Sequence, residues 1–175
     1  TKAFTAQLIV LLVFATVLAS EKGLIDEAQL ADASEKIQKT VNAVEQCLKL
    51  EDKVSAVANN LSEASSAFYL GRGIYFPLAL EGALKLKEIS YIHAEGFASG
   101  ELKHGPIALI TEETPIVFVA PFDELFEKSL SNLQEVAARR GPVILLSDEK
   151  GIAEAGNAPT HVLELPTADE MIAPI

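Results

Sequence analysis

The sequence contains one cysteine, Cys47, among its 175 residues. A single cysteine cannot form a disulfide within the chain, which favours a reducing, cytoplasmic location. Because Cys47 lies in a segment with helical spacing, we expect it to be a buried structural thiol. The sequence also lacks the spacings of zinc sites and the GxGxxG and GxxxxGK(S/T) motifs of nucleotide-binding loops. It therefore predicts neither a metal nor a cofactor.

Positive charge is scarce as well. The chain has 14 Lys and Arg residues against 25 Asp and Glu, a net charge of −11 at pH 7. This balance argues against nucleic acid or an anionic membrane surface as a partner and favours solubility. No internal repeat, low-complexity tract or linker rich in glycine or proline is present. With 49% apolar and 22% charged residues, the composition is that of a globular protein with a sizeable core.

Apolar runs without alternation indicate strands that are buried on both faces of a sheet. Such runs occupy residues 67–70, 115–120 and 143–146, and residues 161–165 supply one more short strand. Helical patterns at 77–93 and 123–140 separate them, so we expect an α/β fold with a parallel sheet, as in a flavodoxin-like αβα sandwich. Helical segments are also expected at 1–19, 25–50 and 53–65. The first is apolar nearly all round, which is typical of a helix central to a core.

The stretch from Phe68 to Pro106 holds most of the candidate chemistry. Gly71-Arg72-Gly73 predicts a tight turn after a strand, and Pro77 suits the first turn of the following helix. On that helix Glu81, Lys85 and Glu88 recur at i, i+4 and i+7 and therefore share one stripe. We expect the helix to be mostly buried and this stripe to line a cleft. A solvated surface pair between Glu81 and Lys85 is the alternative.

The helix leads into residues 95–106, which we expect to form a long, densely ionisable and therefore functional loop. His104 lies in this loop and not on an apolar face, which favours a functional histidine. His93 is expected to cap or pack the helix end. His161 opens a predicted strand and is expected at the surface.

The run ALEGALKLKEISYIHAEGFASGELKHGP (Ala79 to Pro106), preceded by LGRG and followed by TPIVFVAP, resembles the isomerase domain of the glucosamine-6-phosphate synthase family, the glutamine:fructose-6-phosphate aminotransferases. The resemblance extends from TKAFTAQL at the start of the chain to EMIAPI at its end. It implies a sugar-isomerase (SIS) fold, which this family contains as two tandem subdomains. Residues 1–66 would then be helices ending the first subdomain and a connecting segment. Residues 67–175 would be the second subdomain, incomplete at its C-terminus.

The resemblance also implies a function: conversion of fructose 6-phosphate and glutamine-derived ammonia to glucosamine 6-phosphate in a homodimer with an N-terminal glutaminase domain. Opening the sugar and moving a proton between C1 and C2 needs a positioned carboxylate and a cation for the oxyanion. By resemblance, Glu88 is the base, His104 the ring-opening acid/base and Lys85 a third catalytic residue. The residues implied in substrate binding are Arg72, Glu81 and Thr1.

Parts of the family's site have no counterpart here. By resemblance, the loop that grips the sugar phosphate lies upstream of Thr1, and the Schiff-base lysine lies beyond Ile175. The 175-residue fragment alone is therefore expected to be inactive.

The apolar run Leu8–Ala19 mimics a secretory signal peptide with a cleavage site. Its 12 residues are too few to span a bilayer. The missing initiator methionine and the lack of disulfide-forming cysteines argue against a signal peptide, and the resemblance makes the run an internal core helix.

Two alternatives on the same fold stay open. A sugar-phosphate deaminase or deglycase would lack the glutaminase domain. A sensing module that binds sugar phosphate without turnover would have lost the carboxylate or the histidine, whereas Glu88 and His104 are both present.

Overall fold

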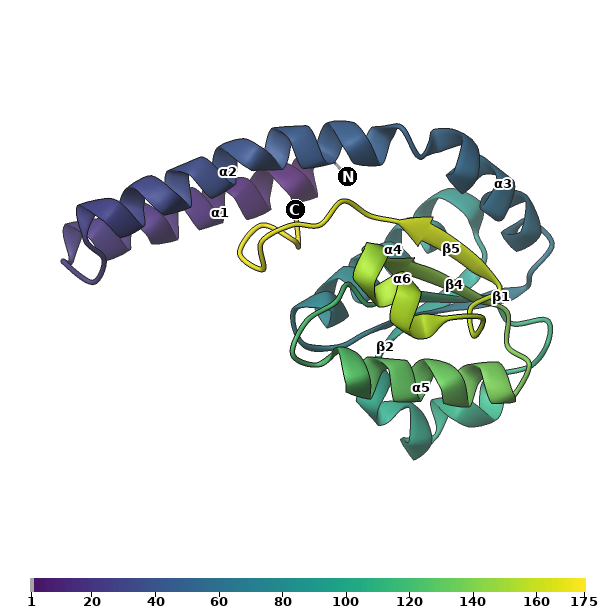
Figure 1. Cartoon of the computed structure of the whole chain (residues 1–175). Coiled ribbons are helices and arrows are strands. Elements are labelled where there is room, and N and C mark those ends of the chain that lie inside the picture. Colours follow the sequence, from purple (N-terminus) through teal and green to yellow (C-terminus); the bar gives the residue numbers. More distant parts are fainter. Residues whose placement is uncertain (1) are drawn as a thin grey trace. The chain divides into compact units, whose positions relative to one another are not determined.

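The computed structural model describes residues 2–175, so the predicted substrate contact of Thr1 lies outside the described residues. The chain divides into two compact units (Figure 1). One unit comprises Thr1–Leu48 with Ala168–Ile175, and the other comprises Lys49–Thr167.

The first unit is a helical hairpin of α1 (Lys2–Glu21) and α2 (Glu27–Leu48), which contact each other along their length. Gly23 forms the turn with a φ of +65°, a conformation that glycine adopts without strain. Asp26 then starts α2: its carboxylate accepts from the Gln29 N–H at 2.8 Å, and the Gln29 side chain accepts from the Asp26 N–H at 3.0 Å. This reciprocal capping fixes the first residue of α2.

Helix α1 contains no buried residue. Six of its large apolar side chains are exposed: Val10, Leu11, Val13, Phe14, Val17 and Leu18. The expected apolar helix is confirmed, but its expected place at the centre of a core stays a prediction, because the described residues leave its apolar surface uncovered. The prediction that the run is too short to span a bilayer was wrong, because the run belongs to a longer helix. By length and composition alone, this 20-residue helix, with a mean hydropathy of 2.2, is long and apolar enough to cross a membrane. The core helix of a soluble protein and a signal sequence near the N-terminus pass the same test.

Cys47 near the end of α2 is exposed, so the predicted buried thiol was wrong. The helical spacing of apolar residues predicted the helix correctly, but the face that carries Cys47 is not covered. The side chain is partly desolvated, and this raises the pKa of the thiol.

The second unit contains a sheet of five parallel strands in the order β2-β1-β3-β4-β5. The strands are β1 (Ser66–Gly71), β2 (His93–Ala98), β3 (Ile116–Val119), β4 (Val143–Ser147) and β5 (His161–Glu164). The four predicted strands are thus confirmed. His161 opens β5 as expected and is partly exposed.

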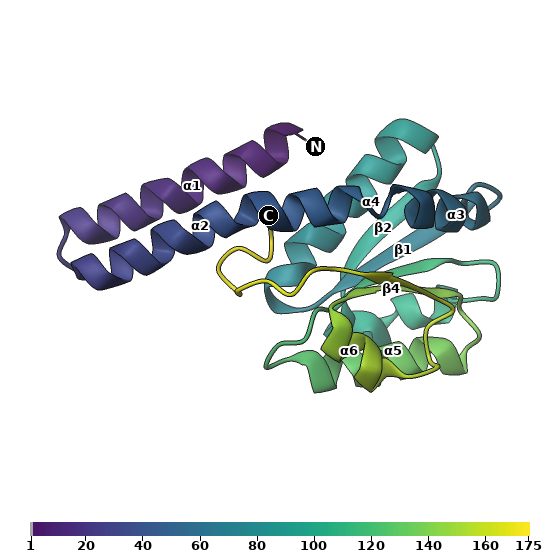
Figure 2. The same ribbon diagram turned by 45° about the horizontal axis from the view of Figure 1, so that its top comes forward.

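Helices cover both faces of this sheet, which makes the unit a three-layer αβα sandwich (Figure 2). The helices are α3 (Glu51–Leu61), α4 (Phe76–Ser90), α5 (Phe126–Ala138) and α6 (Glu149–Ala155). On one face Leu133 and Val136 of α5 pack with Phe118 of β3 and Leu145 of β4 in the larger core. On the other face Val57 of α3 packs against Val117 and Ile144.

The segment after α4 differs from its prediction. Tyr91 adopts the left-handed conformation with a φ of +62° and ends α4, so the helix does not reach His93. His93 instead opens the edge strand β2, and its predicted capping role was wrong. The predicted loop 95–106 consists of the rest of β2, the 3₁₀ helix η2 (Ser99–His104) and the start of a second, η3 (Pro106–Leu109).

Helix α4 is also less buried than predicted. Only Ala79 and Ala83 are buried along it, while Leu80, Leu84 and Ile89 are exposed. Small residues form its contact with the sheet: a Cβ on Gly82 would lie 2.8 Å from the Tyr69 ring. The close approach therefore requires glycine and leaves the longer side chains of α4 outside the contact.

The C-terminal segment Ala168–Ile175 is tied to α2 by Asp169, whose carboxylate lies 3.0 Å from the Lys36 Nζ. The backbone N–H of Met171 and the side chain of Lys36 donate hydrogen bonds that lower the pKa of Asp169. A lowered pKa means that the tie contributes at pH values above about 4 and is lost as pH falls through the folded-state pKa.

We therefore expect acidification from pH 6 to well below pH 4, past the lowered pKa of Asp169, to release this segment. The measurement is amide hydrogen exchange at Met171, whose protection factor relative to the intrinsic exchange rate should fall on acidification. In Asp169→Asn, which lacks the charge that pairs with Lys36, the protection factor at Met171 should be low at every pH and should show no such fall. A wild-type profile identical to that of Asp169→Asn would contradict the assignment.

Candidate functional site

The carboxyl edge of the sheet is where ligands bind in open α/β folds, at the point where the strand order reverses. Here that point lies between β1 and β3, which pair with each other while β2 flanks β1 on its other side. The turn Gly71-Arg72-Gly73 follows β1 directly, as predicted. A Cβ on Gly71 would collide with the carbonyl oxygen of Tyr75, so glycine is required for the 3₁₀ helix η1 (Gly73–Tyr75) to fold back on the strand end.

Arg72 is held at this edge from two sides. Its Nη1 donates to the Oδ1 of Asn132 on α5 at 3.1 Å. On η2, Gly100 lies against the guanidinium, and a Cβ there would sit 3.1 Å from Nη1. The side chain is partly exposed and permanently charged, so it is suited to attract an anionic ligand at this edge.

The charged stripe of α4 forms a three-residue ion-pair network. The Lys85 Nζ lies 2.7 Å from the Glu88 Oε2 and 3.5 Å from the Glu81 Oε1. The hydrogen bond with Glu88 raises the pKa of Lys85, and the charges of Glu81 and Glu88 act in the same direction. Lys85 is therefore protonated at neutral pH and is suited to act as a cation and not as a free amine nucleophile.

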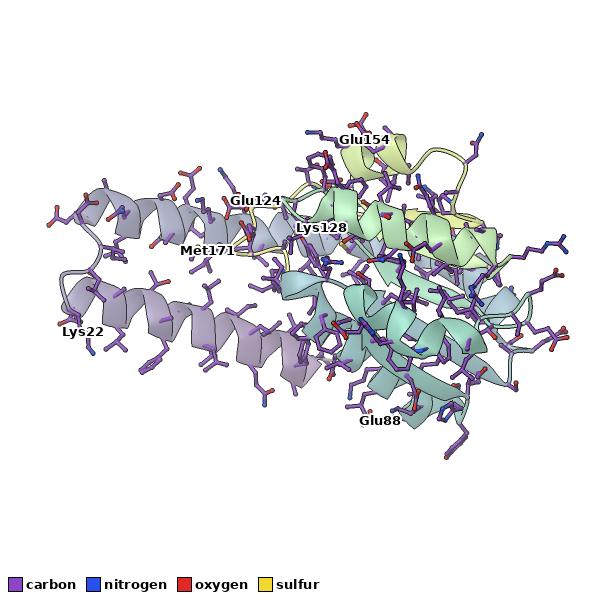
Figure 3. All side chains as sticks on the ribbon, turned by 90° about the horizontal axis from the view of Figure 1, so that it is seen from below. Lys22, Glu88, Glu124, Lys128, Glu154 and Met171 are labelled. Carbon is purple, nitrogen blue, oxygen red and sulfur yellow. The ribbon has the colours of Figure 1, made fainter. Side chains whose placement is uncertain are left out.

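The stripe lies at the surface in the described part of the chain, with Glu88 at the outer side of α4 (Figure 3). The exposed fractions of the side chains are 23% for Glu81, 33% for Lys85 and 51% for Glu88. Glu81 and Lys85 are thus only partly exposed, and the nearer partner of Lys85 is Glu88. The alternative of a solvated surface pair between Glu81 and Lys85 therefore holds only in part. The predicted lining of a cleft by this stripe stays a prediction.

His104 is the last residue of η2 and is exposed. Its two predecessors are fixed: Leu102 is fully buried, and the Lys103 Nζ lies 2.8 Å from the Glu135 Oε1 of α5. Among residues 2–175, no hydrogen bond or ion pair connects His104 with Glu88. The predicted residues therefore form two groups, the stripe on α4 and the junction of β1, η2 and α5.

Asn132, Glu135 and Gly100 belong to the second group and were not predicted. Asn132 lies on the inner face of α5 between Ser129 and Leu133, and all three are buried. The sequence did offer a signal for Asn132, because it places a polar amide in the apolar stripe of an amphipathic helix. Buried amides normally have a hydrogen-bond partner, so a partner for Asn132 could have been expected.

One other feature of the second unit does not suit the predicted chemistry. A cavity of about 370 Å³ lies at the opposite, amino edge of the sheet and is lined by Glu63, Glu112 and Glu113 among others. Three carboxylates disfavour a sugar phosphate through charge repulsion. In the part of the chain that the structure describes, no cluster of three His, Cys, Asp or Glu side chains could hold a metal ion.

The geometry at Gly71 yields a stability prediction. Gly71→Ala places a methyl group against backbone that cannot move independently, so we expect the 175-residue chain to lose about 1–3 kcal/mol of unfolding free energy, as overpacked sites do. Gly100→Ala is the matched control, because its methyl group meets only the flexible end of Arg72. Urea denaturation measures both, and an unchanged midpoint for Gly71→Ala would contradict the packing argument.

Comparison with known proteins agrees with this architecture. The SIS domain model matches residues 60–175. The glutamine–fructose-6-phosphate aminotransferase (isomerizing) of Brucella abortus is 50% identical over all 175 residues, and the enzyme of that name from Zymomonas mobilis is also 50% identical over 175 residues. The chain spans 29% of the length of each of these curated relatives.

A solved structure of the C-terminal domain of glucosamine-fructose-6-phosphate aminotransferase from Francisella tularensis superposes with a TM-score of 0.94 and 47% identity, covering 99% of this chain and 49% of that one. Tagatose-6-phosphate ketose/aldose isomerase from Escherichia coli superposes with a TM-score of 0.64 at 22% identity, over 78% of this chain and 39% of that one. This second similarity shows the fold alone.

Proposed function

The chain belongs to the SIS domain family, and from this membership we propose that it is part of the isomerase domain of a glutamine:fructose-6-phosphate aminotransferase. Such an enzyme converts fructose 6-phosphate and glutamine-derived ammonia to glucosamine 6-phosphate. The observation that carries the proposal is the 50% identity with an enzyme of that name over all 175 residues. The Glu81, Lys85, Glu88 and His104 side chains supply the acid–base groups that the chemistry needs.

Glu88 is the base that moves the proton between C1 and C2 of the sugar. Its Oε2 lies 2.7 Å from the Lys85 Nζ, so a cation stands beside the carboxylate that takes the proton. Because its pKa is raised, Lys85 stays charged while the oxygen at C1 or C2 gains negative charge, and it stabilises that oxyanion. Glu81, at 3.5 Å from the same Nζ, holds the cation in place and contacts substrate.

Arg72 binds substrate at the carboxyl edge of β1. Its charge attracts a sugar phosphate, and its bond to Asn132 orients the guanidinium before the ligand arrives. Thr1 is proposed as a further substrate contact. The sugar-phosphate loop and the Schiff-base lysine belong to other parts of the longer protein, so the activity is that of the longer protein and not of this fragment.

The proposed layout follows the family. Residues 1–66 end the first SIS subdomain and connect to the second, which occupies 67–175 and continues beyond. The longer protein carries an N-terminal glutaminase domain, acts in the cytoplasm and forms a homodimer in which His104 opens the sugar ring.

The proposal is tested by Glu88→Gln in the longer protein. The amide keeps the size of the side chain and can still accept from Lys85, but it cannot take up the proton. We expect turnover of fructose 6-phosphate to fall by about 10²–10⁴, because a positioned general base is lost. The assay is glutamine-dependent formation of glucosamine 6-phosphate.

Glu154→Gln is the control, since Glu154 is an exposed carboxylate on α6 and away from the site residues. It should retain wild-type turnover and so show that a lost surface carboxylate has no general effect. Near-normal turnover of Glu88→Gln would make Glu88 structural.

The same assay separates the alternatives. A deaminase or deglycase releases ammonia from an amino-sugar phosphate and shows no dependence on glutamine. A sensing module binds sugar phosphate without product. The presence of both Glu88 and His104 favours an enzyme over the sensing module.

The homodimer carries a prediction for His104. Its side chain is exposed on η2, so it is free to complete a site on a second copy. In a two-fold dimer such a shared site occurs twice. Co-assembled Glu88→Gln and His104→Ala subunits would then have one doubly defective site and one intact site in each mixed dimer.

Activity should therefore reappear on mixing, in proportion to the heterodimer present. If His104 served its own subunit, every site would stay defective. Heterodimers proven by differential tags yet without activity would overturn the assignment to the second copy.

A further inference from the structure

Helix α5 carries one acceptor for each of two cations at the carboxyl edge of the sheet. Asn132 and Glu135 are three residues apart, so they lie on the same side of the helix. Asn132 accepts from Arg72 at 3.1 Å, and Glu135 pairs with Lys103 of η2 at 2.8 Å. The helix thus holds both the turn after β1 and the segment that carries His104.

The Glu135–Lys103 pair differs from an ordinary surface ion pair. The Lys103 side chain is 63% exposed but that of Glu135 only 26%, whereas both partners of the Glu112–Arg140 pair are exposed, at 66% and 81%. In the described part of the chain the Glu135 Oε2 is buried without a hydrogen-bond partner. Burying an unsatisfied carboxylate oxygen costs free energy, so stability alone does not explain this glutamate.

The geometry of η2 relates Glu135 to His104. A 3₁₀ helix has about three residues per turn, so Leu102, Lys103 and His104 point in three different directions. Leu102 is fully buried and Lys103 is held by Glu135, which fixes two of these directions. The third direction, that of the exposed His104, follows from the other two.

Nothing after His104 supplies the same restraint. Gly105 has a φ of +143°, and a Cβ built there would meet no atom within 4 Å. The chain therefore leaves η2 through an open turn. The orientation of His104 depends on its predecessors and, through Lys103, on α5.

We propose that Glu135 is a positioning residue for His104: it holds Lys103 against α5 and so aims the imidazole out of this chain toward the substrate. The proposal rests on the function proposed above. Glu135 would affect the rate through the alignment of the His104 imidazole, because a catalytic group misplaced by about 1 Å can lower the rate by a factor of about 100.

The first test uses the 175-residue chain, which has three histidines: His93, His104 and His161. Glu135→Gln keeps one acceptor oxygen but removes the charge that holds Lys103. We expect NMR to show altered shifts and line widths for the His104 ring, with the rings of His93 and His161 unchanged. Glu112→Gln, which removes the exposed Arg140 pair, should leave all three histidines unchanged.

The second test measures kinetics in the longer protein. Glu135→Gln should lower kcat by about tenfold or more with KM within about twofold, because substrate contacts persist while a catalytic group is misaligned. Glu112→Gln should behave as wild type. The charge reversal Lys103→Glu with Glu135→Lys restores the ion pair and should recover most of the lost kcat, which a general loss of stability would not do.

The outcomes separate the two proposals. A wild-type protein that forms no glucosamine 6-phosphate refutes the proposed function, and the NMR test still decides whether Glu135 orients His104. Unchanged His104 signals in Glu135→Gln overturn the positioning role. An active wild type with unchanged kcat in Glu135→Gln overturns it as well while the proposed function stands.

Discussion

Pairing on both sides of β1 is the constraint on which the second unit depends. The strand pairs in parallel with β2 from Ser66 to Gly71 and with β3 from Phe68 to Gly71. Its residues Ala67, Phe68 and Leu70 are almost fully buried. The position of its end therefore cannot vary, and every element of the candidate site is placed from it: Arg72 follows directly, α4 folds back after η1, and η2 leaves the adjacent end of β2.

Three of the four predicted strands, β1, β3 and β4, lie inside the sheet and are apolar on both faces. Such runs need no alternation because α3 and α4 cover one side and α5 and α6 the other, so composition alone reveals them. Strand β2 escaped prediction because its sequence, HAEGFA, has no apolar run, which an edge strand tolerates, whereas the edge strand β5 still carries the apolar pair Val162 and Leu163. The short α6 also escaped, although Asp148, whose carboxylate accepts from the Gly151 N–H at 2.9 Å, is a recognisable N-cap.

The site was predictable where sequence distance is short. The i, i+4 and i+7 spacing put Glu81, Lys85 and Glu88 together, and the structure confirms the contacts of Lys85 with both carboxylates. The burial prediction failed because spacing does not tell how much of a helix the sheet covers. The bond from Arg72 to Asn132 joins residues 60 positions apart, and no local pattern could reveal it.

The all-parallel sheet has a consequence for how the chain acquires its structure. No two of its strands can be joined by a tight hairpin, since each parallel pair requires a crossover. β1 cannot pair with β3 until the intervening α4 and β2 have been synthesised and the connection between the two strands has crossed over the sheet. During synthesis β1 therefore emerges with its apolar faces unpaired and must wait for distant segments. Such non-local pairing is typical of slow folding, and the apolar faces of β1 stay exposed to aggregation until its partners arrive.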